Sequence, residues 1–276
     1  MNYRHAYHAG NSADVLKHSV LAGILERLIE KPAPIFVLDT HAGTGLYDIA
    51  GAEADKTEEW RSGIGRLLAA PADEFRRYTD VVRIYNPNGG FTAYPGSPAI
   101  AAELLRPGDR LVLSELHPED AQALRRWAGT RTGVAVHHRD GYETLGAFLP
   151  PREGRGLIVL DPPYESPDEF ERVAQAAILG HHRWPGGRWL IWHPIKDRAP
   201  VWKLEETLIA AGIPKILTAE LLTQPADGVH LAGSGVILIN PPFEAGAWLE
   251  RLLPALQGAL APRSGSHAVR WLTTMN

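Results

Sequence analysis

The sequence predicts an α/β fold in which helices cover both faces of a mostly parallel sheet. Three observations lead to this prediction. Short, nearly continuous apolar runs recur along the chain, amphipathic helical patterns lie between them, and acidic residues follow several of the runs directly. Strands buried on both faces lose the alternation of apolar and polar residues that a half-exposed antiparallel strand keeps.

Seven apolar segments are predicted to form the strands of this sheet. They are rich in valine, isoleucine and leucine, and three of them end in a carboxylate. The expected strands are residues 35–39, 111–115, 134–137, 157–161, 189–192, 216–222 and 236–239.

Helices are expected between these strands. Asn11 or Ser12 can cap a helix over residues 13–30, whose apolar side chains fall on one side. The other helix signals are Ser97 with Pro98, as an N-cap followed by proline at the first helical position, Ser166 with Glu169, as a capping box, and the segments 199–211 and 245–260.

The interval between the first two strands is too long for a simple crossover. About 75 residues separate Asp39 from Glu115, whereas a strand–helix–strand unit needs only about 30. Residues 53–70 and 72–85 have helical patterns, and a long unstructured loop is uncommon in compact domains. We therefore expect residues 49–95 to form a helical insertion within a single domain spanning residues 1–276.

Composition excludes several classes of protein. The chain has no cysteine, which rules out disulfides, thiolate zinc sites, iron–sulfur clusters and cysteine nucleophiles. No apolar run reaches the roughly 18–20 residues that span a bilayer, and the polar, aromatic N-terminus does not resemble a secretory signal, so we expect a cytoplasmic protein. The net charge of −4 predicts that any contact with nucleic acid uses a local patch.

A short glycine loop follows the first expected strand directly. Residues 39–45 read Asp-Thr-His-Ala-Gly-Thr-Gly, and glycines allow the backbone to turn tightly and approach a ligand closely. Glu115, at the end of the second expected strand, can accept hydrogen bonds from both hydroxyls of a ribose. Each feature alone is weak evidence, because a solvated carboxylate at a strand end is common.

A second motif follows the fourth expected strand. Asp161-Pro162-Pro163-Tyr164 removes two backbone donors and leaves a rigid, acceptor-rich turn. The Asp161 carboxylate and the Pro162 carbonyl can accept from one exocyclic amino group, while Tyr164 stacks on its base. This motif resembles the amino-methyltransferases, which methylate an exocyclic nitrogen of adenine or cytosine with S-adenosylmethionine. The glycine loop is similar to theirs, with His41 in place of an aromatic residue.

A second stretch also fits the broader form of that motif. Asn240-Pro241-Pro242-Phe243 comes three strands later, at the end of an expected terminal hairpin. Chain order favours Asp161, because in methyltransferases of this order the motif follows the fourth strand. We therefore interpret Asn240 as structural.

Further segments narrow the resemblance to the bacterial 23S ribosomal RNA adenine-N6 methyltransferase family, of the RlmJ type, over essentially the whole chain. The similar segments are Tyr3-Arg4-His5, His8-Ala9-Gly10-Asn11, Asp14-Val15-Leu16-Lys17-His18, Asp39-Thr40-His41-Ala42-Gly43, Tyr94-Pro95-Gly96-Ser97-Pro98, Glu115-Leu116-His117-Pro118, Asp140-Gly141, Asp161-Pro162-Pro163-Tyr164, Ala232-Gly233-Ser234-Gly235 and Asn240-Pro241-Pro242. The resemblance implies a Rossmann-like class I methyltransferase sheet with a helical insertion after the first strand. It also implies S-adenosyl-L-methionine as cofactor and one adenine of 23S ribosomal RNA as substrate. We further expect a monomer with no metal and no membrane partner.

The resemblance also implies roles for particular residues. The cofactor would contact Lys17, His18, His41, Gly43, Ser97, Glu115, Asp140, Gly141 and Asp161. The catalytic set would be Asp161, Pro162 and Tyr164, and the RNA would meet Tyr3, Arg4 and His5, in an N-terminal arm over residues 1–11, together with Tyr164. Asp161 is compatible with two roles, as a proton acceptor or as a group that only orients the amine.

Each assignment has a plainer structural alternative. Lys17 and His18 could form a solvated helix face, His41 could be a core histidine, and Asp140 could simply cap the next helix. The aromatic residues from Trp184 to Trp192 are expected in the core rather than against a base.

Three other functions share some of these features. A nicotinamide-dependent dehydrogenase would need Gly-x-Gly-x-x-Gly after the first strand, which residues 41–45 do not supply. A non-catalytic RNA-binding protein could use the arm but would not need a cofactor pocket. A DNA adenine methyltransferase is the nearest alternative, and only the arm and the overall resemblance favour RNA. The histidine pairs 137–138 and 181–182 lack a metal-binding frame such as His-Glu-x-x-His.

Overall fold

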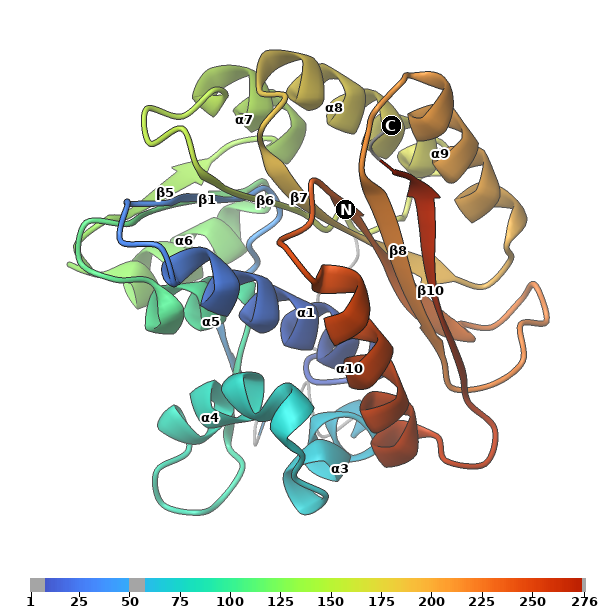
Figure 1. Cartoon of the computed structure of the whole chain (residues 1–276). Helices are drawn as coiled ribbons and strands as arrows, with labels where there is room; N and C mark the ends of the chain where they lie inside the picture. Colours follow the sequence, from blue (N-terminus) through green and yellow to red (C-terminus); the bar gives the residue numbers. More distant parts are fainter. Residues whose placement is uncertain (1–7, 50–57, 275–276) are drawn as a thin grey trace.

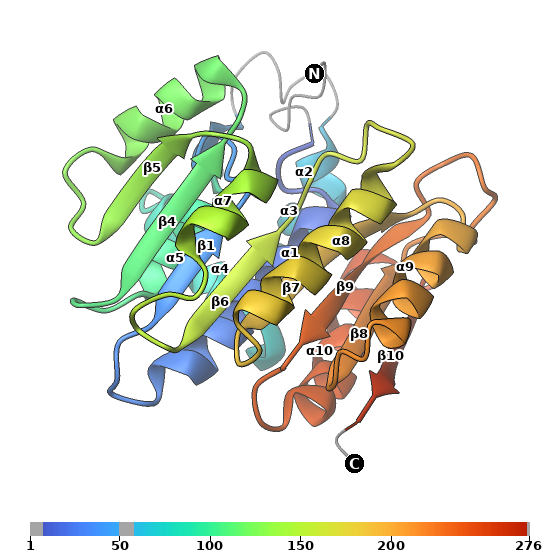
Figure 2. The same cartoon turned by 90° about the horizontal axis from the view of Figure 1, so that it is seen from above.

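The computed structural model describes residues 8–49 and 58–274, which form an eight-stranded sheet with helices on both faces (Figures 1 and 2). The strand order is β10-β8-β9-β7-β6-β1-β4-β5. The strands are β1 (Phe36–Asp39), β4 (Arg110–Glu115), β5 (Val134–His138), β6 (Gly156–Leu160), β7 (Arg188–Ile195), β8 (Ile216–Leu222), β9 (Gly233–Ile239) and β10 (Ser266–Thr273).

The five strands from β5 to β7 are parallel, which confirms the predicted fold class. β9 runs antiparallel to both β7 and β8, and β10 runs antiparallel to β8. All seven expected strands are present. The sequence pattern missed β10, since this strand lies at the sheet edge, is partly exposed and lacks a continuous apolar run. The hairpin that ends at Asn240 is therefore not terminal.

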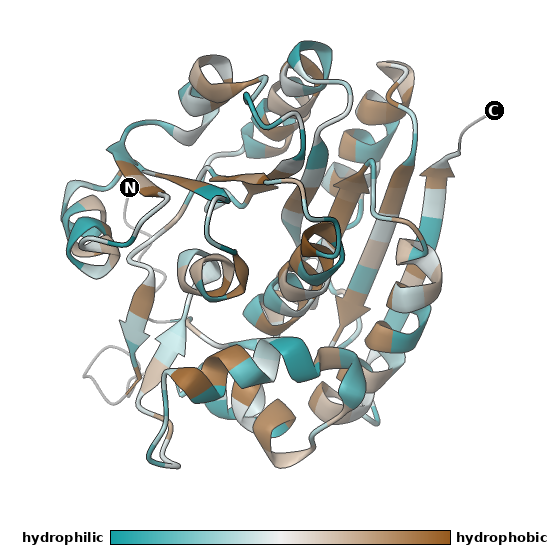
Figure 3. Cartoon of the chain, turned by 60° about the vertical axis from the view of Figure 1, so that its left-hand side comes forward, coloured by the Kyte–Doolittle hydropathy of each residue, from teal (hydrophilic) through white to brown (hydrophobic). Residues whose placement is uncertain are grey.

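Each face of the sheet buries its own core. Val37 of β1 and Val159 of β6 face one cluster, whereas Leu38 and Ile158 face the other, as the alternation of side chains along a strand requires. In Figure 3 hydrophobic residues gather on the sheet and on the helix surfaces turned towards it. One face is covered by α1 (Ser12–Ile29), α5 (Ser97–Leu104), α6 (Pro118–Ala128) and α10 (Ala245–Leu260), and the other by α7 (Gly141–Phe148), α8 (Glu169–Arg183) and α9 (Ala199–Ala210) (Figure 1).

The segment between β1 and β4 adds a layer beneath α1 and α10 (Figure 1). Where single helices over 53–70 and 72–85 were expected, the described residues form shorter pieces. A break falls at Gly63, whose missing side chain lets the backbone approach Gly10: a Cβ would lie 2.0 Å from the Gly10 carbonyl oxygen. The pieces are α2 (Glu59–Ser62), α3 (Ile64–Ala69), the 3-10 helix η3 (Asp73–Phe75), α4 (Arg76–Ile84) and a small antiparallel pair, β2 (Leu46–Asp48) with β3 (Ala93–Pro95).

One of the three predicted helix caps is confirmed and two are wrong. Asn11 Oδ1 accepts hydrogen bonds from the backbone amides of Ala13 and Asp14, both at 3.0 Å. Gly96, not Ser97, occupies the N-cap of α5, and the Ser97 side chain lies beside Asp39 instead. At α8 the N-cap is Asp168 rather than Ser166, and no capping box forms.

The capping box fails because its carboxylate has another partner. Glu169 is buried and accepts a hydrogen bond from the Tyr142 hydroxyl at 2.5 Å. The Ser166 hydroxyl donates to the Asp168 carboxylate. Tertiary contacts therefore override the local signal at this helix start.

Candidate active site

A cavity of about 630 Å³ opens where β1, β4, β6 and β7 end and α1 begins. Parallel strands bring their carboxyl ends to one edge of the sheet, so loops far apart in sequence meet there. Every described residue that the sequence proposed for the site lines this cavity: Lys17, His18, His41, Gly43, Ser97, Glu115, Asp140, Gly141, Asp161, Pro162 and Tyr164. Tyr3, Arg4 and His5 lie outside the described residues.

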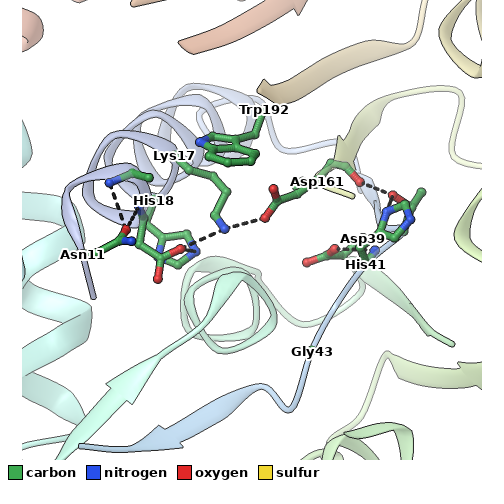
Figure 4. A network of polar contacts seen from close by, with 12 residues as sticks. Asn11, Lys17, His18, Asp39, His41, Gly43, Asp161 and Trp192 are labelled. Carbon is green, nitrogen blue, oxygen red and sulfur yellow. Dashed lines mark hydrogen bonds and ion pairs between the residues drawn. The ribbon is translucent and has the colours of Figure 1, made fainter. Parts of the chain in front are cut away.

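Lys17 joins α1 to the turn after β6 (Figure 4). Its ammonium nitrogen Nζ lies 2.5 Å from Asp161 Oδ2 and 2.9 Å from Asp14 Oδ1, and the side chain is almost fully buried. Burial alone would lower the pKa of Lys17, but attraction to Asp14 and Asp161 raises it well above its usual value. Lys17 therefore stays charged and holds one oxygen of Asp161. Asp14 was missed by sequence reasoning, although its position three residues before Lys17 on a helix was a usable signal.

Aromatic side chains hold the turn that follows Asp161. Tyr164 adopts a positive φ of 52°, and its hydroxyl donates to the Trp192 carbonyl at 2.8 Å. Its ring packs against Phe170 and Trp192, with centroid distances of 4.7 and 5.8 Å. Trp184 and Trp189 lie in the core as expected, but Trp192 lines the cavity, which corrects that part of the prediction.

The glycine loop and Glu115 form the opposite side of the cavity. The backbone amide of Gly43 donates to Glu115 Oε2 at 2.8 Å, and that of His117 donates to Oε1 at 2.7 Å. Gly43 has φ +61°, and a Cβ there would lie 2.1 Å from the Tyr47 hydroxyl oxygen. Burial raises the pKa of Glu115. Each carboxylate oxygen still has acceptor capacity beyond its one backbone partner.

Asp39 ends β1, two residues before His41 of the cavity wall. It is 2% exposed, and Oδ1 accepts a hydrogen bond from the His41 amide at 3.3 Å. Burial raises the pKa of Asp39 to about 6, an effect that the neighbouring Ser97 hydroxyl and Lys17 partly offset. The sequence placed Asp39 in the glycine motif but did not assign it a role in the site.

Of the two proposed site histidines, His18 is buried and His41 is half-buried. Burial lowers the pKa of His41 to about 4, so it is neutral at physiological pH, and its ring meets the edge of Tyr142 at 5.3 Å. His18 Nδ1 lies 2.6 Å from the Tyr94 hydroxyl, which in turn lies 2.9 Å from the Tyr78 hydroxyl. Lys17 and His18 therefore do not form a solvated helix face.

Asp140 both caps a helix and faces the cavity. Its Oδ1 accepts from the Tyr142 amide at 2.7 Å, while Oδ2 lies 3.7 Å from Arg172 Nη2. A Cβ on Gly141 would lie 2.1 Å from the Thr40 carbonyl oxygen, so only glycine lets α7 come this close to β1. Sequence reasoning missed Tyr142, Glu169 and Arg172, all of which line the same wall.

Asn240 lies at the opposite end of the strands from the cavity. Because β9 runs antiparallel to β7, Ile239 pairs with Trp189 near the start of β7. The Asn240 Nδ2 group donates to the carbonyls of Pro185 and Gly187 at 2.7 and 2.8 Å. The side chain is thus used for structure, as chain order predicts.

Among residues 8–49 and 58–274, no group of three or more histidine, aspartate or glutamate side chains is placed to hold a metal ion. Within the same ranges no helix has the length and apolar character needed to cross a membrane.

Known proteins resemble this chain over nearly its full length. Proteins called ribosomal RNA large subunit methyltransferase J from Haemophilus influenzae and from Escherichia coli K12 are each 41% identical to it, over 278 and 277 residues, and in both cases 99% of each chain is covered. A crystal structure of a Legionella pneumophila protein superposes with a TM-score of 0.90 at 34% identity, covering 96% of this chain and 98% of that one.

A more distant structure shares the fold alone. A probable spermidine synthase from Corynebacterium glutamicum is 13% identical, with a TM-score of 0.53, covering 91% of this chain and 73% of that one. A family model described as "Ribosomal RNA large subunit methyltransferase D, RlmJ" matches residues 32–273. With this match and the two 41% identical relatives, the chain belongs to the RlmJ family of ribosomal RNA large subunit methyltransferases.

Proposed function

We propose that this protein transfers a methyl group from S-adenosyl-L-methionine to the exocyclic N6 of one adenine in 23S ribosomal RNA, as a cytoplasmic monomer. One observation carries the proposal. The Asp161 carboxylate, which can accept from an amino group, lines the same cavity as the carboxylates of Glu115 and Asp140, which follow neighbouring strands. The names of the two 41% identical relatives support ribosomal RNA as the substrate.

The cavity fits S-adenosyl-L-methionine in chemistry. Glu115 offers a carboxylate to the ribose hydroxyls, and Asp140 Oδ2 offers an acceptor to the adenine amino group. The backbone at Gly43 lies so close to Tyr47, and that at Gly141 so close to Thr40, that a side chain at either position would clash. Only glycine therefore fits at these two positions of the cavity wall. Lys17, His18, His41 and Ser97 complete the proposed set of cofactor contacts.

The reaction needs positioning more than it needs acid–base strength. Bound S-adenosyl-L-methionine supplies an activated methyl group on a sulfonium. The Asp161 carboxylate and the Pro162 carbonyl would accept hydrogen bonds from the target amino group and turn the nitrogen lone pair towards that methyl group. Tyr164, fixed by Trp192, would stack on the flipped base. As the new N–C bond forms, the bond between the methyl carbon and the sulfur breaks and the sulfur leaves as a neutral thioether; the amine then loses an N6 proton, for which Asp161 is the proposed acceptor.

The RNA is proposed to meet the N-terminal arm. Tyr3, Arg4 and His5 combine a stacking ring with positive charge in an otherwise acidic protein. The described residues His8 and Asn11, where the arm enters α1, line the cavity. Both bind Glu59 of α2, through His8 Nδ1 at 3.0 Å and Asn11 Nδ2 at 3.0 Å. The proposed insertion therefore supports the base of the arm.

Asp161→Ala tests the proposal directly. We expect methylation of a 23S ribosomal RNA fragment to fall about 100-fold or more, because a group that positions the reacting nitrogen is lost. The measurement is single-turnover transfer from radiolabelled cofactor, with the modified base identified by mass spectrometry. A DNA oligonucleotide of the same sequence, run in parallel, separates an RNA enzyme from a DNA enzyme.

Asn240→Ala is the matched control. It removes two hydrogen bonds at the opposite edge of the sheet and should reduce thermal stability while leaving turnover of the folded protein within a few-fold of wild type. Near-normal turnover of Asp161→Ala, or an inactive but folded Asn240→Ala, would contradict the assignment.

A further inference from the structure

One wall of the cavity is a set of four polar side chains from the starts of α7 and α8. Asp140 caps α7 through Oδ1 and leaves Oδ2 at 3.7 Å from Arg172 Nη2. Tyr142 donates its hydroxyl to Glu169 Oε1 at 2.5 Å, and Arg172 Nη1 lies 3.4 Å from the same oxygen. All four line the cavity, and the proposed function uses only Asp140.

The set restricts where the Arg172 guanidinium can lie. Its carbon Cζ lies over the Tyr142 ring, 4.5 Å from the centroid, and Glu169 attracts it from the side. Glu169 is only 4% exposed, and a carboxylate buried to that extent requires charged or donating partners. The Arg172 side chain itself remains 44% exposed, so its outer donors are open to the cavity.

Asp140 and Arg172 together present an acceptor beside a donor. A separation of 3.7 Å is too long for a hydrogen bond between them, so Oδ2 and Nη2 each keep capacity for a ligand. Adenine carries the complementary pair, because its amino group donates and the adjacent ring nitrogen accepts. Hypoxanthine reverses both positions: its oxo group accepts where the adenine amino group donates, and its adjacent ring nitrogen N1 carries a proton and cannot accept.

We propose that Arg172 is a specificity-determining residue for the cofactor base: it donates to the ring nitrogen of the cofactor adenine, next to the amino group accepted by Asp140. This inference rests on the proposed function, since it assumes that the cofactor's adenine occupies this wall. A purely structural role, in which the four side chains only join α7 to α8, would affect adenine and hypoxanthine ligands equally.

The experiment compares two ligands by calorimetric titration of the full chain. S-adenosylhomocysteine carries adenine, and S-inosylhomocysteine carries hypoxanthine. We expect wild type to favour the adenine ligand by about 10-fold or more, the range for a hydrogen bond to a charged group. In Arg172→Met, adenine-ligand affinity should fall about 10-fold while hypoxanthine-ligand affinity changes little, so that the preference falls about 10-fold, to the part that Asp140 supplies. Arg172→Lys keeps the charge but not the planar fork, so its preference for the adenine ligand should lie between those of wild type and Arg172→Met.

Arg139→Met is the matched control. Arg139 lies next to Asp140 in sequence, pairs with Glu143 at 3.4 Å and does not line the cavity. Its removal changes the net charge equally and should leave the preference intact. An unchanged preference in folded Arg172→Met, or equal loss for both ligands, overturns the inference. Failure of wild type to bind S-adenosylhomocysteine overturns the proposed cofactor instead, so the two failures are distinguishable.

Discussion

Glu115 serves two purposes with one carboxylate. It receives the amides of Gly43 and His117 and so ties the glycine loop to the end of β4. We expect Glu115→Ala to weaken S-adenosylhomocysteine binding about 10- to 150-fold, because charged acceptors of the ribose hydroxyls are lost. Calorimetric titration measures this. Glu119→Ala removes an exposed carboxylate from the first turn of α6, outside the cavity, and should bind normally; equal affinities for Glu115→Ala and wild type would contradict the ribose assignment.

The Asp39 carboxyl is expected to make the free energy of unfolding depend on pH. Burial raises the pKa of its carboxyl from 3.8 to about 6, so the folded state binds this proton more tightly than the unfolded state does. Stability contributed by the proton is present below about pH 4 and is lost as pH rises through about 6. Asp39→Asn removes this loss, since an amide does not ionise.

The expected result is a stability difference that grows with pH. The free energy of unfolding of Asp39→Asn minus that of wild type should increase by about 2–3 kcal/mol between pH 4 and pH 8. Urea denaturation at several pH values measures it, and contributions of other titrating groups that the substitution leaves unchanged cancel in the difference. A difference that stays constant with pH would show that Asp39 is not the group concerned.

At the level of elements, α1 carries the site on a helix that is buried on most sides. Asn11 caps it and also donates to Glu59 Oε2, so the cap joins the helix start to α2. We expect Asn11→Ala to reduce the free energy of unfolding by about 1 kcal/mol, since two backbone amides lose their acceptor.

Chemical denaturation of purified variants tests this prediction. Asn11→Ser keeps an oxygen that can cap the helix but removes the donor to Glu59, so most of the stability should return. If serine and alanine are equally destabilising, the contact with Glu59 and not the cap is what matters.

Helix starts differ in how well local sequence predicts them. Asn11 acts on its own neighbours in the chain, so the motif was sufficient. Ser97 and Glu169 carry equally good local signals, but Asp39 and Tyr142, which are distant in sequence, lie beside them in the fold. A cap contributes about 1 kcal/mol, so a buried polar contact can readily displace it.

At the scale of the whole molecule, sheet topology decides which of the two proline motifs lines the cavity. Asp161 and Asn240 both precede a pair of prolines, but parallel β6 and antiparallel β9 end at opposite edges of the sheet. The division into one domain with an insertion over 49–95 stays a prediction, since the described part of that segment shows only its individual helices and strands.

The sequence by itself determined the sheet, its seven apolar strands and the residues proposed for the cavity. Continuous apolar runs indicate strands that are buried on both faces of the sheet. Acidic residues and glycines at strand ends indicate that a site lies at the carboxyl ends of the parallel strands. Only the tertiary structure decided that Lys17 bridges Asp14 and Asp161, that Trp192 lines the cavity, and that Arg172 lies next to Asp140. These contacts join elements distant in the chain, and their geometry depends on helix packing that no local pattern encodes.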